Sequence, residues 1–328
     1  MVPKLYILRL LYHREVKDTM DNRKEFYFPS ADGKTQIHAV EWAPAGEPVG
    51  VLQIAHGVSE YALRYEPFAR FLNEHGFLVV ANDHIGHGQS VAAGAPAIYF
   101  GEKDGWTHVV DDMYALRNLT HNAHPTLPYF LLGHSMGSFL TRTFLIRYPG
   151  AVKAAIIMGT GQQSPIMVSG GKAAAAVIGR KRGFNRFDET INQLAFGAYN
   201  KAFEPKRTDF DWLSANEENV DAYIADPLCG GGATVGLFRD MLGGIGLISK
   251  ASNLRKMDLN TPILFISGEQ DPVGDMGKGV QRAYESFRRA GVKDVSIKLY
   301  PGLRHEILNE KERGQVYDDL WAWIEPRM

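Results

Sequence analysis

Short segments rich in apolar residues recur along the chain, and each predicts a strand. Most are apolar at successive rather than alternate positions, which is typical of strands buried on both faces of a parallel sheet. The eight predicted strands are residues 25–28, 36–43, 49–55, 77–81, 129–132, 152–158, 262–267 and 295–300. A short turn, Ala31–Lys34, joins the first two, so we expect that pair to be antiparallel at one edge of the sheet.

Segments with apolar residues at helical spacing lie between and after these strands. They cover residues 67–75, 105–122, 139–148, 276–290 and 310–324. Strands that alternate with helices are typical of an α/β fold, in which helices cover both faces of the sheet. The pattern therefore predicts a mostly parallel eight-stranded sheet between two layers of helices.

Residues 161–232 interrupt this alternation. They contain a patch of small residues, Gly170–Ala176, and an acidic stretch, Asn216–Asp221. A connection of this length is uncommon between a strand and the next element of a compact domain. We expect it to form an inserted cap, with residues 21–160 and 233–328 forming the core.

The first 20 residues also differ from the rest. Met1–Tyr12 is apolar, but Lys4 and Arg9 interrupt it, and no small-residue cleavage site follows as in a signal peptide. We expect residues 1–20 to be an N-terminal extension and the core to begin near Asp21. A helix that anchors the protein at a membrane interface is the alternative for this segment.

Composition narrows the class of protein. Hydrophobic residues make up 45% of the 328 residues, enough for a full core. The 36 Lys and Arg residues nearly balance the 37 Asp and Glu residues, which does not favour a nucleic-acid partner. The single cysteine, Cys229, excludes an internal disulfide and fits a reducing compartment, so we expect a cytoplasmic protein. No apolar run is long enough to predict a transmembrane helix, while peripheral membrane contact and the oligomeric state stay open.

A turn of the form Gly-x-Ser-x-Gly joins the strand at 129–132 to the helix at 139–148. It is Gly133–Gly137, with the sequence Gly-His-Ser-Met-Gly. In a nucleophile elbow, such a turn strains the serine and exposes its hydroxyl at the end of the sheet. The serine oxygen then lies over a helix N-terminus, which favours negative charge. We therefore expect Ser135 to be a catalytic nucleophile.

A serine hydroxyl needs a base to take its proton, and the base needs a carboxylate to orient it. In α/β sheets such groups lie just beyond the carboxyl ends of strands. Asp271 and His305 each follow a predicted strand, and Glu269 is the competing acid. The order Ser135, Asp271, His305 is the order of nucleophile, acid and base known for this architecture.

Two backbone amides are candidates for binding the oxyanion. One belongs to Met136, directly after the serine, and the other to Val58, in the loop after the third strand. Such donors are worth about 10²–10³ in rate each. His56 and Gly57, just before Val58, are expected to shape this loop rather than to react.

The other histidines do not predict a metal site. His84 and His87 are close in sequence, as are His121 and His124, but neither pair has further ligands at zinc-like spacing. The dinucleotide fingerprint Gly-x-Gly-x-x-Gly is absent. We therefore expect no metal and no other cofactor. His134, beside the candidate nucleophile, is expected to pack inside the elbow.

At these motifs the chain resembles the α/β-hydrolase superfamily, and within it the monoacylglycerol lipase and lysophospholipase-like serine hydrolases. The resemblance covers residues 21–324. It rests on the family's oxyanion loop, its Asp-x-x-Gly-His-Gly-x-Ser loop, its elbow, and the segment where its cap rejoins the core. The matching residues here are His56–Tyr61 with Arg64 and Tyr65, Asp83–Ser90, Gly133–Gly137 and Asp226–Leu228. The chain departs from the family pattern at Tyr61 (usually His), Ile85 (usually Arg) and Ser138 (usually Gly).

The resemblance implies an α/β-hydrolase fold that carries an inserted cap. It implies hydrolysis of a carboxylic ester, a monoacylglycerol or lysophospholipid, through an acyl-enzyme formed on Ser135. The partner would be this small acyl ester, met in water or at a lipid surface. A peptidase or amidase, or a carboxylesterase for small esters, is the alternative on the same scaffold, and a non-catalytic binder is the alternative outside enzymes.

Overall fold

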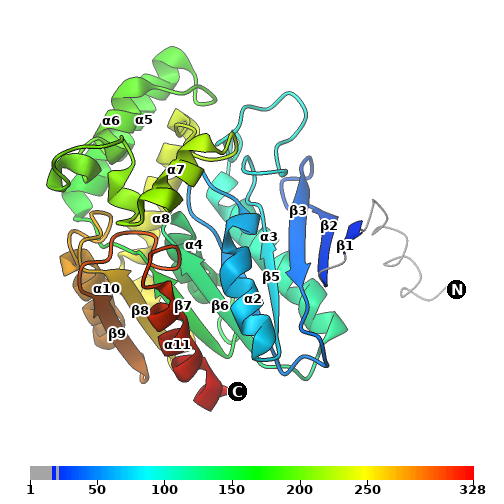
Figure 1. Cartoon of the computed structure of the whole chain (residues 1–328). Coiled ribbons are helices and arrows are strands. Elements are labelled where there is room, and N and C mark those ends of the chain that lie inside the picture. The colour runs from blue at the N-terminus through cyan, green and yellow to red at the C-terminus, as the bar shows by residue number, and fades with distance from the viewer. Residues whose placement is uncertain (1–16, 20–21) are drawn as a thin grey trace, which may run out of the picture.

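The computed structural model describes residues 17–19 and 22–328, and these form one nine-stranded sheet with helices on both faces (Figure 1). The strands are β1 (Lys17–Thr19), β2 (Arg23–Pro29), β3 (Gln36–Trp42), β4 (Gly50–Ala55), β5 (Phe77–Asn82), β6 (Tyr129–His134), β7 (Ala154–Met158), β8 (Ile263–Gly268) and β9 (Val295–Tyr300). Their order across the sheet is β1-β2-β3-β5-β4-β6-β7-β8-β9. The neighbours β1–β2, β2–β3 and β3–β5 are antiparallel, and the other neighbours are parallel.

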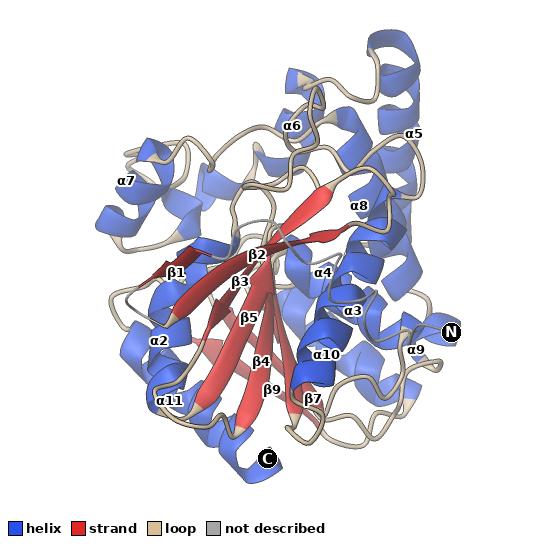
Figure 2. Cartoon of the chain, turned by 90° about the vertical axis from the view of Figure 1, so that its right-hand side faces the viewer, coloured by secondary structure: helices blue, strands red, loops and turns tan. Residues whose placement is uncertain are grey.

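Helices α2 and α11 cover one face of the sheet, and α3, α4 and α10 cover the other (Figure 2). The α-helices are α2 (Glu66–Glu74), α3 (Gly105–Ala123), α4 (Met136–Arg147), α5 (Pro165–Arg182), α6 (Glu189–Phe196), α7 (Glu217–Ala225), α8 (Val235–Ile248), α9 (Ala251–Leu254), α10 (Lys278–Ala290) and α11 (Arg313–Ile324). The short 3₁₀ helices are η1 (Ala62–Tyr65), η2 (Tyr199–Ala202), η3 (Asp211–Leu213) and η4 (Glu325–Arg327).

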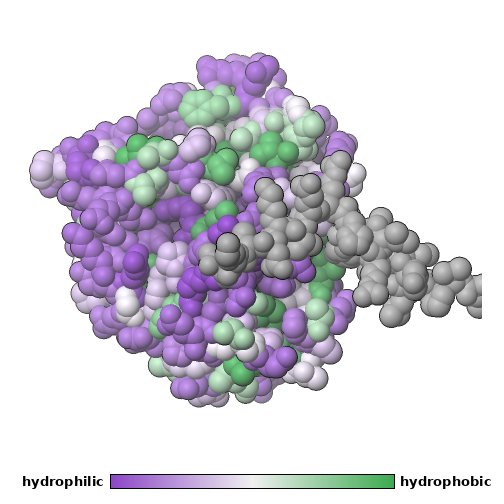
Figure 3. All heavy atoms as spheres, turned by 45° about the vertical axis from the view of Figure 1, so that its right-hand side comes forward, coloured by the Kyte–Doolittle hydropathy of each residue, from purple (hydrophilic) through white to green (hydrophobic). Residues whose placement is uncertain are grey.

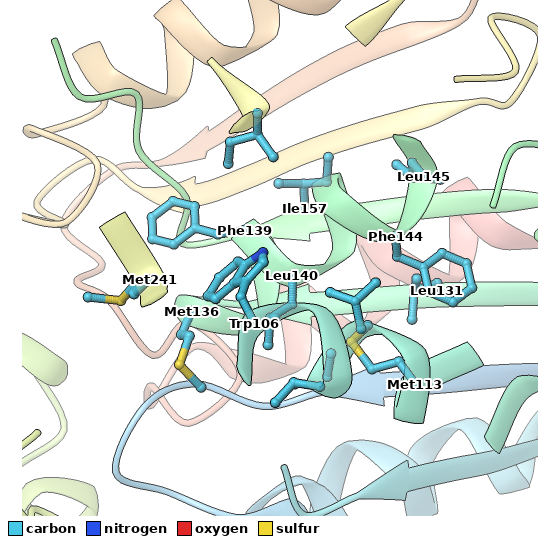
Figure 4. Packing of buried hydrophobic residues seen from close by; sticks show 14 of the residues in the cluster. Trp106, Met113, Leu131, Met136, Phe139, Leu140, Phe144, Leu145, Ile157 and Met241 are labelled. Carbon is cyan, nitrogen blue, oxygen red and sulfur yellow. The ribbon is translucent and has the colours of Figure 1, made fainter. Parts of the chain in front are cut away.

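The two layers of helices bury both faces of the central strands. Alternate residues of a strand point to opposite faces, so Leu131 of β6 packs on the α3–α4 side and Leu132 packs on the α2–α11 side. Figure 4 shows Leu131 near Phe144 of α4 and Met113 of α3, on the side of the sheet that α3 and α4 cover. Each fully buried Leu stabilises the fold by about 1.5–3 kcal/mol, and such strands are apolar at most positions.

The predicted fold class is confirmed, and all eight predicted strands are present. The predicted antiparallel pair is β2–β3 at one side of the sheet. The helix predicted at 276–290 begins later, at Lys278, because Asp275, Met276 and Gly277 have positive φ angles of 52°, 51° and 81°. The ninth strand, β1, was not predicted, and it pairs with β2. The segment Met1–Tyr12 lies outside the described residues.

Helices α5, α6 and α7 lie above the sheet in Figure 1, between β7 and α8 along the chain. They belong to the region predicted to form a cap, and that region is largely helical as it runs from one core element to the next. Its limits at residues 161 and 232 stay a prediction. In the part of the chain that the structure describes, no helix has both the length and the apolar character needed to cross a bilayer. On the face in Figure 3, hydrophobic side chains form small separate patches within a hydrophilic surface.

Asp112 is a buried carboxyl group that ties α3 to the turn between β2 and β3. Its Oδ2 accepts a hydrogen bond from the Ser30 hydroxyl at 2.8 Å, and its Oδ1 accepts one from the Ala31 amide at 2.6 Å. Burial raises the pKa of Asp112 to about 7, against the effect of these two donors. An acid with this shift binds its proton more tightly in the folded than in the unfolded chain.

We predict that Asp112→Asn removes a pH-dependent loss of stability. The pKa of Asp112 is higher in the folded than in the unfolded chain. The wild-type free energy of unfolding therefore falls as the pH rises from the unfolded pKa of Asp112 to its folded pKa. Relative to the variant, wild type should lose roughly 2–3 kcal/mol between pH 5 and pH 8. Urea unfolding of both proteins at the two pH values measures this, and an equal difference at both would contradict it.

Candidate active site

The turn between β6 and α4 is a strained elbow. Ser135 has φ 54° and ψ −120°, a conformation that residues other than glycine rarely adopt. A Cβ atom on Gly133 would lie 2.3 Å from the Gly137 carbonyl oxygen, and one on Gly137 would lie 2.0 Å from the Ala55 carbonyl oxygen. The two glycines therefore allow α4 to cross β6 and β4 at close range, with Ser135 at the crossing.

The elbow lies where the winding of the sheet changes direction. Strand β4 is flanked by β5 on one side and by β6 on the other, and all three are parallel. At such a switch point the loops that leave neighbouring strands separate, and a crevice opens at the carboxyl ends. Ser135 after β6, Asp271 after β8 and His305 after β9 all lie at this end of the sheet.

His305 and Asp271 come together, as predicted. Nδ1 of His305 lies 2.9 Å from Oδ1 of Asp271, and both side chains are buried. The ring N–H does not point straight along this line. The competing acid, Glu269, is exposed to solvent.

Asp271 is held by two further donors. The Ser267 hydroxyl donates to its Oδ2 at 2.9 Å, and the Val273 amide donates to its Oδ1 at 2.9 Å. Burial alone would raise the pKa of Asp271, but His305 and these donors lower it below its ordinary value. A carboxylate that stays charged can orient an imidazole and support its positive charge.

Ser135 and His305 line the same cavity, whose volume is about 380 Å³. The His305 ring also lies beside the elbow, with its centroid 4.6 Å from that of His134. Both imidazoles border Gly159, where an added Cβ would lie 3.1 Å from a ring carbon of each. The predicted nucleophile and the predicted base therefore face one space.

The predicted oxyanion donors lie on two sides of the nucleophile. Met136 is the first residue of α4, where backbone amides have no partner within the helix. Val58 lines the cavity, and its neighbour Gly57 is so close to the elbow that an added Cβ would lie 3.1 Å from the Ser135 Cβ. This approach suits an oxyanion loop, and the binding of an oxyanion by both amides stays a prediction.

The cap forms the rest of the cavity wall. The ring of Trp212 in η3 lies 5.1 Å from the His305 ring, measured between centroids. Other cap side chains that line the cavity include Asn192, Gln193, Phe196, Asn200 and Phe210. The aromatic rings offer apolar contact, while the amides of Asn192 and Asn200 are hydrogen-bonded to the main chain nearby.

Hydrogen bonds join the cap to two of the loops that carry the site. The Glu306 amide donates to the Leu213 carbonyl at 2.7 Å, which ties the His305 loop to the cap. The Tyr223 hydroxyl donates to the Ser59 carbonyl at 3.0 Å, which ties the oxyanion loop to α7. The cap therefore helps to fix the geometry of both loops.

Tyr61, which departs from the family pattern, also connects the oxyanion loop to the cap. Its hydroxyl donates to Oδ2 of Asp226 at 2.7 Å, close to the point where the cap rejoins the core. A second departure, Ile85, is buried in the core. Neither residue lines the cavity.

The remaining histidines near the site have structural contacts. His56 donates from Nδ1 to the Gly57 carbonyl at 2.7 Å and accepts at Nε2 from the His84 amide at 2.9 Å, so it is neutral and shapes the loop, as predicted. Asp83 accepts hydrogen bonds from the Ala62 amide and the Gln89 amide. Within residues 17–19 and 22–328, no group of three or more His, Cys, Asp or Glu side chains could hold a metal ion.

Two contacts in the site were not predicted. Arg64 forms a bidentate ion pair with Glu306, from Nη1 to Oε1 at 2.7 Å and from Nη2 to Oε2 at 2.8 Å. The second contact is the packing of Trp212 against His305. Arg64 was noted only as part of a motif, and 242 residues separate it from Glu306. No periodicity or spacing in one sequence indicates a pair so far apart.

The fold and the convergent serine, histidine and aspartate define the class of the protein, a serine hydrolase with the α/β-hydrolase fold. The chain belongs to the family described as serine aminopeptidase, S33, whose sequence model matches residues 46–312. The resemblance inferred from the motifs is thereby confirmed at the level of the superfamily.

Two similar proteins are lipases. The chain is 32% identical to the monoacylglycerol lipase of Mycolicibacterium smegmatis, over 92% of this chain and 97% of that protein. It is 28% identical to the human monoglyceride lipase, over 91% of this chain and 89% of that protein.

Two solved structures are similar to this chain. A thermostable carboxyl esterase from Bacillus coagulans, in complex with glycerol, superposes with a TM-score of 0.86 at 29% identity, covering 94% of this chain and 99% of that chain. A soluble variant of the monoglyceride lipase from Saccharomyces cerevisiae superposes with a TM-score of 0.74 at 18% identity, covering 97% and 98%. At that identity the second likeness concerns the fold alone.

We predict that Gly137→Ala prevents or severely weakens folding. Its methyl group would meet the Ala55 carbonyl, which belongs to a central strand and cannot move aside. We expect a loss of more than about 3 kcal/mol in the free energy of unfolding. Gly170→Ala is the matched control, because this exposed glycine in α5 has open space around its Cβ position. Equal melting temperatures for the two variants would contradict the prediction.

Proposed function

We propose that this protein hydrolyses carboxylic esters of lipid-like substrates, with a monoacylglycerol as the preferred class. The observation that carries the proposal is the meeting of His305 with Asp271 at 2.9 Å, in the cavity that Ser135 also lines. The relatives named above as monoacylglycerol and monoglyceride lipases support the choice of substrate.

In this mechanism Ser135 Oγ attacks the acyl carbonyl carbon while Nε2 of His305 takes the hydroxyl proton. Asp271 orients the imidazole through Nδ1 and supports its positive charge. The oxyanion of the tetrahedral intermediate accepts hydrogen bonds from the amides of Val58 and Met136. His305 then returns the proton to the departing alcohol oxygen, which leaves an acyl-enzyme. A water molecule, activated by the same imidazole, releases the fatty acid and restores the serine.

The carboxylates near the site disfavour an aminopeptidase, the activity in the family's description. A free-amine substrate needs an unpaired carboxylate to bind its ammonium group. Glu60 and Glu306 border the cavity, but both are already paired with Arg64, at 2.9 and 2.7 Å. An ester with a neutral alcohol group does not require such a partner.

A lysophospholipid and a small ester are the other candidates. Lys206 lines the cavity and could meet a phosphate, but it is already paired with Asp209. The structural similarity to a carboxyl esterase supports a carboxylic ester as substrate, and a small ester is the further candidate within that class. A neutral glycerol head group needs no charged partner, which suits a cavity where Glu60, Glu306 and Lys206 are already paired.

We also propose that the protein is cytoplasmic and meets its substrate at a lipid surface. Residues 161–232 act as the cap in this proposal, and 21–160 with 233–328 act as the core. The start of α5 supports contact with lipid, because Ile166 is 85% exposed and Met167 is 65% exposed.

The proposed triad predicts which substitutions abolish activity. Ser135→Ala should lose labelling by a fluorophosphonate probe and lower kcat for a p-nitrophenyl ester at least about 1,000-fold. Asp271→Asn should lower kcat about 100-fold or more, while Glu269→Gln, at the exposed acid, should leave it unchanged. Equal labelling of wild type and Ser135→Ala would show that the reactive serine lies elsewhere.

The proposed substrate predicts a hydrolysis profile. At equal concentration, kcat/KM should be highest for monoacylglycerols, lower for lysophospholipids and short esters, and at least about 100-fold lower for aminoacyl-nitroanilides. Replacing both Ile166 and Met167 by Asp should slow hydrolysis of monoacylglycerol in vesicles but not of a water-soluble short ester. Faster cleavage of the nitroanilides would favour the peptidase instead.

A further inference from the structure

A buried cluster of charged and polar side chains joins the oxyanion loop, the elbow and the His305 loop. Its members are Glu60, Arg64, Tyr65, His134 and Glu306. Glu60 accepts hydrogen bonds from the Gly57 amide at 2.6 Å and the Tyr65 hydroxyl at 2.8 Å. Arg64 Nη1 bridges the two carboxylates, at 2.9 Å from Glu60 Oε2 and 2.7 Å from Glu306 Oε1.

The charges of this cluster balance only if His134 is positive. The hydrogen bond with His134 and the charge of Arg64 lower the pKa of Glu60 against the effect of burial. Arg64 does the same for the pKa of Glu306, so both carboxylates are charged. Arg64 supplies one positive charge against these two negative charges. An uncompensated charge in a buried site is costly, and an imidazolium at position 134 would remove it.

The hydrogen bonds around His134 also require a proton on each ring nitrogen. Nε2 lies 3.2 Å from the His305 main-chain carbonyl oxygen, which can only accept. Nδ1 lies 2.9 Å from the Tyr65 hydroxyl and 3.1 Å from Glu60 Oε1. The Tyr65 hydroxyl donates its one proton to Glu60 Oε1, so it has no proton left for Nδ1. The carboxylate oxygen of Glu60 can only accept hydrogen bonds. Nδ1 must therefore donate to its neighbours rather than accept from them.

We propose that His134 is held as an imidazolium and acts as a positioning residue for His305. Its Nε2–H fixes the main chain of His305, and its charge, 4.6 Å away between ring centroids, opposes protonation of the His305 ring. This inference rests on the proposed role of His305 as the base. The consequence is that the base stays free to accept the serine proton at lower pH than it otherwise would.

The surroundings of His134 are consistent with this charge. Burial alone would lower the pKa of His134, but Glu60 and Glu306 raise it above the ordinary value. The other groups that face His134 are the neutral His56 at the end of β4, Tyr65 from η1 and His305 itself. As expected from the sequence, His134 is buried inside the elbow.

The pH dependence of kcat/KM for a p-nitrophenyl ester tests the proposal with His134→Gln. Glutamine keeps an N–H donor but carries no charge. The acidic limb of the profile should move to higher pH by about one unit, because protonation of the base is no longer opposed. His124→Gln, at the end of α3 and outside the cluster, is the matched control and should reproduce the wild-type profile. An unmoved acidic limb in His134→Gln would overturn the proposal.

Should His134→Gln fail to fold, the double variant Glu60→Gln/His134→Gln removes one charge of each sign and should recover folded protein. Its acidic limb should move in the same direction by a smaller amount, because Glu60 contacts Nδ1 of His134 whereas the His305 main chain contacts Nε2. Folded double variant with the wild-type acidic limb would also overturn the proposal.

NMR of the wild-type protein labelled with ¹⁵N-histidine tests the charge without any substrate. The His134 signals are those missing from His134→Gln or from the double variant. Both ring nitrogens should carry protons at pH 8, well above the ordinary pKa of about 6.5. A neutral tautomer at that pH would overturn the proposal. This readout does not depend on ester hydrolysis, so its failure is distinguishable from failure of the proposed function.

Discussion

The close crossing of α4 over β6 and β4 is the constraint on which the rest of the site depends. No side chain fits at Gly137, because the Ala55 carbonyl oxygen lies 2.0 Å from the place of its Cβ. The crossing keeps Ser135 in a strained conformation that costs about 1–3 kcal/mol. Helix α4 can hold that strain because 11 of its 12 residues are buried between the sheet and the neighbouring helices. Each large apolar side chain among them contributes about 1.5–3 kcal/mol on burial.

The other parts of the site are arranged around this fixed point by the order of the strands. Because β4 and β6 are neighbours, the oxyanion loop and the elbow emerge side by side. Asp271 and His305 follow β8 and β9, which are adjacent to each other, so a carboxylate and an imidazole separated by more than 30 residues come within 2.9 Å. The buried cluster around Glu60 joins these loops beside the cavity, and hydrogen bonds connect two of the loops to the cap.

Sequence patterns predict the sheet and the strand ends that carry the proposed site residues, because both depend on local features. A strand buried on both faces is apolar at most positions, and the proposed site residues follow such strands. Contacts between distant surfaces have no such signature. The Arg64–Glu306 ion pair and the packing of Trp212 on His305 arise only when the cap and the loops meet. Likewise, the late start of α10 depends on positive φ angles at Asp275 and Met276, residues that do not usually adopt them.

In the proposed mechanism, Ser135 is a nucleophile because His305 takes its proton and two main-chain amides bind the oxyanion that forms. A crystal structure of the protein after reaction with an alkyl phosphonate would test this arrangement. We expect phosphorus bonded to Ser135 Oγ and the phosphonyl oxygen within hydrogen-bonding distance of the Val58 and Met136 amides. We also expect His305 Nε2 within such a distance of Oγ. Phosphorus on another residue, or a phosphonyl oxygen turned away from both amides, would contradict it.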